Sequence, residues 1–242
     1  MQNFIPWRFR QFIKRLLPAG ARLEPQYRGK SNPEIFNHIY AHGAWGRTED
    51  GLSTSGTGSH TAQIIEPYIK AVGDWLAEIQ PDTIVDLGCG DFNVGKNFVG
   101  RTKNYVACDV STVILDRNRE KFRDLNNVEF RQLDLAQDAL PEGDVCFVRQ
   151  VLQHLSNRDI RRFVEKVNRD RPFRYLVVSE HLPDTDNFRP NRNKPSGGNI
   201  RLCLNSGVVL HQKPFYLSAR KHSVLLEVNE SEGIIRTTVY AF

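Results

Sequence analysis

The feature that most constrains the fold of this 242-residue chain is a pair of apolar runs. The first run ends in a glycine turn and the second in an acid. Residues 84–90 read Ile-Val-Asp-Leu-Gly-Cys-Gly, and the run Tyr105-Val-Ala-Cys-Asp109 follows them. A strand, a tight turn and a second strand with a terminal carboxylate make up the first half of an α/β nucleotide site. Gly88 and Gly90 allow backbone N–H groups to approach a ligand closely. Asp109 can accept hydrogen bonds from two ribose hydroxyls.

The residues around the glycines distinguish between cofactors. A dinucleotide fingerprint needs a third glycine at the position of Asn93, so that a helix can pack close under a pyrophosphate. Asp86 stands two residues before Gly88, where a carboxylate suits a cationic ligand better than a pyrophosphate. The stretch resembles the first motif of the class I S-adenosylmethionine-dependent methyltransferases, in which an acid precedes Gly-x-Gly. The resemblance implies S-adenosyl-L-methionine as the cofactor, which carries an amino group and a sulfonium.

Further motifs resemble a bacterial branch of that family, whose acceptors are small molecules or glycans. They are Gly88-Cys-Gly-Asp-Phe-Asn93, Ser55-Gly-Thr-Gly-Ser59, and Arg149-Gln150 followed by His154-Leu-Ser156. Gln150 replaces an acid of that branch, which puts a catalytic base at this position in doubt. The resemblance covers roughly residues 34–242.

The carboxyl ends of the expected strands hold polar residues, and ligands of open α/β sheets bind at these ends. The resemblance implies that Asp109 holds the ribose and that Asp134 contacts the adenine amino group. Asp134 by itself is equally consistent with a turn or a helix cap, but three acids in register along one sheet edge favour a site. The residues expected to bind the cofactor are Asp86, Gly88, Cys89, Gly90, Asp91, Asn93, Asp109, Val110, Asp134, Leu135, Arg149 and Gln150.

Methyl transfer is an in-line displacement, so the protein mainly positions the two partners. We expect a small-molecule or glycan acceptor that is methylated on oxygen, for which a histidine suits the role of general base. His154 is the first candidate and His181 the second, and either is alternatively a structural histidine. Basic residues in the loop 184–201 either bind a phosphate or carboxylate of the acceptor or are simply solvated; the candidates are Arg189, Arg192 and Arg201.

Alternating strand and helix patterns predict an α/β fold: a Rossmann-like, doubly wound, mostly parallel seven-stranded sheet that ends in an antiparallel hairpin, with an N-terminal helical cap. We divide the chain into a basic amphipathic leader and linker over 1–33, a cap or lid with the first helix over 34–80, and a methyltransferase domain over 81–242. The Gly/Ser/Thr-rich residues 51–60 are either a plain linker or a lid over the cofactor. Strands are expected at 83–87, 104–109, 128–133, 144–149, 174–180, 223–228 and 234–241. Helices are expected at 61–79, 93–100, 111–125 and 156–169, and a short helix that ends at Gly43 is expected within 34–46.

The positive charge is concentrated at the N-terminus. Residues 1–30 contain seven of the 33 Lys and Arg and one of the 28 acids, so this segment carries +6 and the remainder −1. The basic pI of about 9.1 therefore belongs to the N-terminal segment, and it is weak evidence for a catalytic face that binds nucleic acid. Residues 1–18 contain an amphipathic pattern, which indicates a helix on an anionic membrane surface or one docked on the protein itself; its apolar side holds Ile5, Phe9, Phe12, Ile13, Leu16 and Leu17.

Several classes of protein fit the sequence poorly. The four cysteines show no paired metal spacing, so we expect no metal site. No apolar run approaches the ~18–20 residues of a membrane span, and no secretory signal is evident, so we expect a cytoplasmic protein, either free or at the inner face of the membrane. Two alternatives remain: an RNA or protein methyltransferase that grips its substrate through the leader, and a non-catalytic, membrane-peripheral protein that binds the cofactor.

Overall fold

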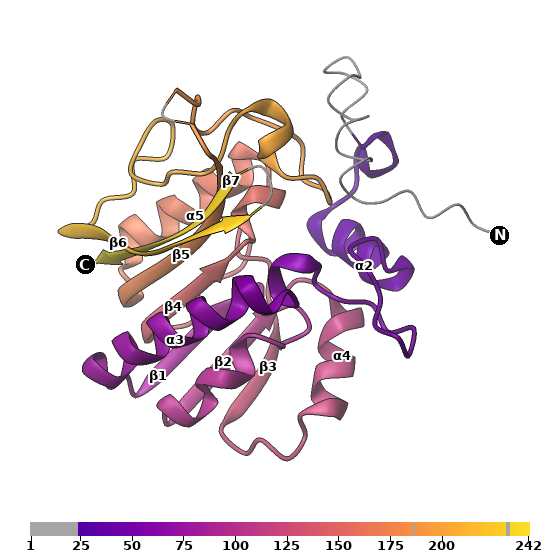
Figure 1. Ribbon diagram of the computed structural model, residues 1–242, viewed down its shortest axis with the longest axis vertical. Helices are drawn as coiled ribbons and strands as arrows, with labels where there is room; N and C mark the ends of the chain where they lie inside the picture. The colour runs from indigo at the N-terminus through magenta and orange to yellow at the C-terminus, as the bar shows by residue number, and fades with distance from the viewer. Residues whose placement is uncertain (1–23, 186, 231–232) are drawn as a thin grey trace.

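A single seven-stranded sheet with helices on both faces forms the centre of the molecule (Figure 1). The computed structural model describes residues 24–185, 187–230 and 233–242. The strand order is β3-β2-β1-β4-β5-β7-β6, in which β1 to β5 are parallel and β7 runs antiparallel to both β5 and β6. This is the Rossmann-like fold expected from the sequence. The strands are β1 Thr83–Leu87, β2 Asn104–Asp109, β3 Val128–Gln132, β4 Gly143–Arg149, β5 Phe173–Pro183, β6 Lys221–Glu230 and β7 Gly233–Ala241.

Alternating side chains of the central strands supply two hydrophobic cores, one on each face of the sheet. In β4, Cys146 and Val148 belong to the core that contains α5 residues such as Phe163. Val145 and Phe147 point the other way, into the core formed with α3. Because both faces of the central strands β1, β4 and β5 are covered, these strands are largely apolar and buried, whereas the edge strand β3 carries exposed polar residues. The α-helices among the described residues are α2 Asn32–His42, α3 Ala62–Ile79, α4 Thr112–Lys121 and α5 Asn157–Asp170.

The N-terminal cap is helix α2, which packs against α4 beside the carboxyl ends of the strands (Figure 1). A reciprocal capping box between Ser31 and Glu34 starts the helix, and Gly43 ends it in the left-handed conformation. Its Asn37 accepts a hydrogen bond from Ser111 Oγ at 2.8 Å, at the start of α4. These contacts fix α2 over the sheet edge where the ligand site is expected.

Some element boundaries differ from the predicted ones. The predicted helix 93–100 is a 3₁₀ helix, Gly95–Arg101. The Asn97 side chain donates to the carbonyls of Val94 and Asn93 at 2.9 and 3.1 Å, which favours a turn over a regular α-helix. Helix α4 stops at Lys121 rather than at 125, and β5 continues three residues further than predicted because its pairing with β7 extends to Pro183.

The amphipathic leader over residues 1–18 lies outside the described residues, so its expected helix stays a prediction. No helix in the part of the chain that the structure describes is both long and apolar enough to cross a membrane.

Candidate active site

A cavity of about 230 Å³ lies at the carboxyl ends of the parallel strands, next to the point where the strand order reverses between β1 and β4. Ligands of doubly wound sheets bind at this position. The cavity extends from the ends of β2 and β3, past the glycine turn, to the ends of β5 and β7. Its walls include most of the predicted cofactor residues: Gly88, Cys89, Gly90, Asp109, Val110, Asp134, Leu135, Arg149 and Gln150.

The glycine turn is required by the packing of the protein as well as by a ligand. Gly88 and Gly90 have φ angles of +83° and +56°, in the region that favours glycine. A Cβ atom on Gly88 would overlap the side chain of Val151, and one on Gly90 would overlap Ser55. The turn therefore presents its backbone to the cavity because no side chain fits at either position.

Two acids face the cavity from neighbouring strand ends. The Asp109 carboxylate accepts hydrogen bonds from the N–H groups of Gly90 at 3.0 Å and Ser111 at 2.9 Å. Burial raises the pKa of Asp109 to about 6, although these two N–H groups oppose the shift. Asp134 accepts from the N–H of Ala136 at 2.8 Å, and burial raises its pKa as well. Both acids keep lone pairs that are available to a bound ligand.

Asp86 lies beneath the glycine turn and does not line the main cavity. Its carboxylate accepts a 3.0 Å hydrogen bond from the hydroxyl of Tyr105, and burial raises its pKa to about 7. Side chains alternate along a strand, so Asp86 points to the same side of the sheet as Ile84, toward the α3 core. Asp86 therefore supports the turn from below.

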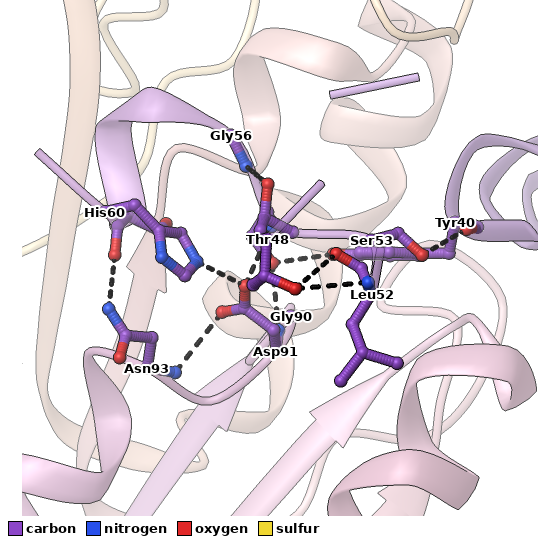
Figure 2. A network of polar contacts seen from close by, with 12 residues as sticks. Tyr40, Thr48, Leu52, Ser53, Gly56, His60, Gly90, Asp91 and Asn93 are labelled. Atoms are coloured by element: carbon purple, nitrogen blue, oxygen red, sulfur yellow. Dashed lines mark hydrogen bonds and ion pairs between the residues drawn. The ribbon is translucent and has the colours of Figure 1, made fainter. Parts of the chain in front are cut away.

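Asp91 and Asn93 hold the segment 55–59 over the cavity (Figure 2). The Asp91 carboxylate accepts from the N–H of Ser55 at 2.9 Å and contacts His60 Nε2 at 2.5 Å. Asn93 Nδ2 donates to the carbonyl of Ser59 at 2.8 Å. The Gly/Ser/Thr-rich stretch is thus a wall of the cavity, and neither Asp91 nor Asn93 lines the main cavity itself.

Arg149 ties the same segment to the end of β4. Its guanidinium donates to the carbonyl of Gly58 at 2.5 Å and to Ser59 Oγ at 3.2 Å, and it lies 4.9 Å from the ring centroid of Tyr68. Burial lowers the pKa of Arg149. The next residue, Gln150, adopts a φ of +55° and also lines the cavity. Arg149 ends β4 and Gln150 follows it, at the strand end where the sequence predicts cofactor contacts.

The far end of the cavity contains the two predicted histidines. The ring of His154 packs against Trp45, with 4.8 Å between centroids. Burial lowers the pKa of His154 to about 3, and the positive charge of Lys194 adds to this effect. His181 Nε2 lies 3.2 Å from a carboxylate oxygen of Glu230, and both of these residues line the cavity.

The three arginines predicted to bind the acceptor do not line this cavity. Arg189 and Arg192 are exposed, while Arg201 is fully buried. The Arg201 guanidinium donates to the carbonyls of Leu152 and Leu155 at 2.7 and 2.6 Å, so it fixes the turn before α5 from behind. Sequence patterns distinguish poorly between a cation that contacts a ligand and one that holds a turn.

Sequence reasoning missed several residues that line the cavity: Asn32, Phe36, Tyr40, Trp45 and Glu230. The first four lie on or just after α2, whose position over the strand ends has no local sequence signal. Glu230 was assigned to a hairpin turn, yet β6 extends through it. Among the described residues, no group of three or more His, Cys, Asp or Glu side chains is placed to hold a metal ion.

Comparisons with known proteins agree with this geometry. Residues 85–169 match a family model described as a methyltransferase domain. The N-methyltransferase NodS from Bradyrhizobium japonicum WM9, solved with S-adenosyl-L-homocysteine (SAH), has a TM-score of 0.57 at 10% identity, covering 80% of this chain and 93% of that one. The N-terminal domain of EvdMO1, solved in the presence of SAH and D-fucose, has a TM-score of 0.52 at 14% identity, with 84% and 95% covered.

A third solved structure, the DhpI–SAH complex, has a TM-score of 0.51 at 16% identity and covers 88% of this chain and 98% of that one. No curated protein is significantly similar to the chain in sequence. At these identities the structural likenesses show a shared fold, while the family model covers the glycine turn, Asp109 and Asp134. Buried carboxylates at two adjacent strand ends beside a glycine turn suit a ligand with ribose hydroxyls and an amino group. A methyltransferase domain thus matches residues 85–169, the stretch that carries these strand ends.

Proposed function

We propose that this chain is an S-adenosylmethionine-dependent methyltransferase that acts on a hydroxyl group of a small-molecule or glycan acceptor, with His181 as the general base. The observation that carries the proposal is the pair of His181 and Glu230, 3.2 Å apart in the wall of the cavity that also contains Asp109 and the glycine turn. An imidazole beside a carboxylate can take a hydroxyl proton, because the carboxylate stabilises the imidazolium that forms.

The proposed cofactor site occupies the half of the cavity near β2 and β3. S-adenosylmethionine, when bound, supplies a methyl group on a sulfonium, which needs no further activation by the protein. Asp109 would hold the ribose hydroxyls and Asp134 the adenine amino group, with Val110 and Leu135 as apolar neighbours that line the same walls. Asp86, Asp91, Asn93 and Arg149 would act indirectly, because they support the turn or the segment 55–59.

His181 is the better base of the two histidines in the cavity. The neighbours of His154 are the cations Lys194 and Arg201, and its pKa of about 3 means that it resists protonation. Glu230 instead places a negative charge beside His181. This order is the reverse of the one expected from the sequence. His154 is then a neutral side chain that lines the acceptor half and packs on Trp45.

The charge of the acceptor half favours an uncharged acceptor. The ionisable residues that line it are His154, His181 and Glu230, and Arg149 is engaged with Gly58 and Ser59. Among the described residues that line the cavity, the only Lys or Arg is Arg149, so a phosphate or carboxylate there would face Glu230 without a further cation to pair with it. A neutral hydroxyl can donate to His181 and meets no such penalty.

Transfer of a radioactive methyl group from labelled cofactor into a fractionated lysate tests the proposal. We expect label in the small-molecule or glycan fraction, and label in RNA or protein would contradict it. His181→Asn should lower the rate of transfer by about 10²–10⁴-fold, the usual contribution of a general base, with unchanged SAH affinity in calorimetry. His222→Asn, at an exposed position on β6, is the matched control and should keep wild-type activity.

The leader supports a second proposal, that residues 1–18 tether the enzyme to an anionic membrane surface. Residues 1–30 carry a net charge of +6, and each basic residue near such a surface contributes about 1 kcal/mol. Flotation with anionic liposomes should be stronger for the full chain than for a chain that starts at Ala19, and should weaken with salt. Equal flotation of the two proteins would refute the tether.

A further inference from the structure

We infer that Asn32, on the N-terminal helix α2, is a positioning residue for adenine recognition that fixes the Asp134 carboxylate as an acceptor for the 6-amino group. The inference rests on the cofactor placement proposed above and is independent of the acceptor. It assigns part of the cofactor site to a helix that lies outside the matched methyltransferase domain, residues 85–169.

One face of α2 forms a wall of the cavity. Asn32, Phe36 and Tyr40 recur at every fourth position, so they lie on the same side of the helix, and all three line the cavity. Asn32 is at the end of this row next to β3, where its Nδ2 lies 3.2 and 3.4 Å from the two carboxylate oxygens of Asp134. Asn32 and Asp134 are only 9% and 8% exposed, so their hydrogen bond is shielded from water.

The backbone of Asn32 is held from both sides. The capping box of Ser31 and Glu34 encloses it in the first turn of α2, and Pro33 follows it. One turn further, Asn37 binds the start of α4 through Ser111. The Asn32 side chain therefore reaches Asp134 from a fixed point, which is what a positioning role requires.

The hydrogen bonds to Asp134 determine what it can recognise. Burial raises the pKa of Asp134, and the nearby carboxylates of Asp138 and Asp159 add to this effect, whereas the Ala136 N–H and the Asn32 amide oppose it. Lys166 is a further charged neighbour, and it too favours the ionised form.

An ionised carboxylate only accepts hydrogen bonds, so it pairs with the 6-amino group of adenine and repels the 6-oxo group of hypoxanthine. Asn32, by donating to the carboxylate, favours this acceptor-only state.

Calorimetric affinities for SAH and for S-inosylhomocysteine, its 6-oxo counterpart, test the inference in the full-length protein. The wild type should prefer SAH by at least about 100-fold, because the deaminated ligand leaves buried acceptors unpaired. In Asn32→Leu the ratio of the SAH affinity to the S-inosylhomocysteine affinity should fall by about tenfold or more. Asn32→Asp, a variant of nearly the same shape, places two carboxylates together that must share a proton, and it should narrow the preference as well.

Asn37→Leu is the matched control, because it removes an asparagine from the same helix that contacts α4 and not Asp134. It should lower stability and leave the ratio of the two affinities unchanged. The inference is overturned if Asn32→Leu and Asn32→Asp keep the wild-type ratio, or if Asn37→Leu changes it equally. Wild-type protein that binds neither ligand would overturn the cofactor placement too, whereas failure of transfer to hydroxyl acceptors would leave the inference intact.

Discussion

The two ends of the cavity are built in different ways. The end near β2 and β3 consists largely of strand-end residues such as Asp109 and Asp134, which follow the glycine turn within a short stretch of chain. The other end joins Trp45, His154, Gly198 and Glu230, which come from four separate parts of the chain. The first end is therefore specified by local sequence and the second by long-range packing.

The long-range end is held together by contacts within the cavity wall and behind it. Trp45 Nε1 donates to the carbonyl of Gly198 at 3.2 Å, and Lys194 Nζ donates to the carbonyl of His154 at 3.0 Å. Burial lowers the pKa of Lys194 to about 7 and raises that of Glu180, behind the same turn, to about 8. The acceptor end thus depends in part on two buried charged side chains, Lys194 and Glu180, that do not themselves line the cavity.

The largest expected effect lies at the locally specified end. Asp109→Ala removes the proposed ribose acceptor and the partner of the Gly90 and Ser111 N–H groups. Hydrogen bonds to a charged group contribute about 1.5–3 kcal/mol each, so the loss of at least two should weaken SAH binding by about 100-fold or more in calorimetry.

Asp116→Ala is the control for this change, because it removes an acid from the same part of the chain that is exposed and paired only with Arg119. Its SAH affinity should stay within about twofold of the wild-type value. Unchanged affinity in folded Asp109→Ala would show that the cofactor does not occupy this end.

The contrast between the two ends also explains what the sequence could predict. Asp109 and Asp134 were predictable because strands of a parallel sheet end at a common edge, which gives their acids one location. The orientation of Asp86 follows from the alternation of side chains along a strand, which turns it toward the α3 core. Arg201 and Glu230 could not be assigned, since their surroundings depend on segments distant in sequence: the turn at Leu152 for Arg201 and strand β5 for Glu230.

The pH dependence of stability should reveal the contribution of Asp86, the buried acid beneath the glycine turn. The folded pKa of Asp86 is raised by burial to about 7. The contribution of protonated Asp86 to the free energy of unfolding is therefore fully present below its pKa in the unfolded chain, about 4. It is lost as the pH rises through the folded pKa of about 7. Asp86→Asn keeps an acceptor for the Tyr105 hydroxyl but cannot ionise.

The free energy of unfolding of the wild type should thus fall between about pH 5 and pH 8, by on the order of 2 kcal/mol more than that of Asp86→Asn. Urea unfolding at several pH values measures both. Asp109 and Glu180, whose pKa values are also raised by burial, leave a shared slope in both proteins. Parallel curves for the two proteins would mean that Asp86 ionises freely in the folded state.

The smallest expected effect concerns the segment that spans both ends. His60 holds the segment 55–59 through its 2.5 Å contact with Asp91. Burial opposes ionisation of Asp91, but the hydrogen bonds from His60 and from the Ser55 N–H prevail and lower its pKa. Ionised Asp91 therefore stabilises the folded protein above its pKa in the unfolded chain. This contribution is lost as the pH falls through the lower pKa that Asp91 has in the folded protein.

At neutral pH, His60→Ala should cost about 1 kcal/mol or less, because a single hydrogen bond contributes about that much and His60 is partly exposed to solvent. Hydrogen exchange at residues 55–60 should accelerate, and SAH should dissociate a few-fold faster, while its association changes little. His42→Ala, at the exposed end of α2, is the matched control and should leave both rates unchanged. If hydrogen exchange accelerated but SAH dissociation did not, the cofactor would be held by the strand ends alone, and the segment 55–59 would be a wall of the acceptor end only. Unchanged exchange would show that His60 does not hold the segment.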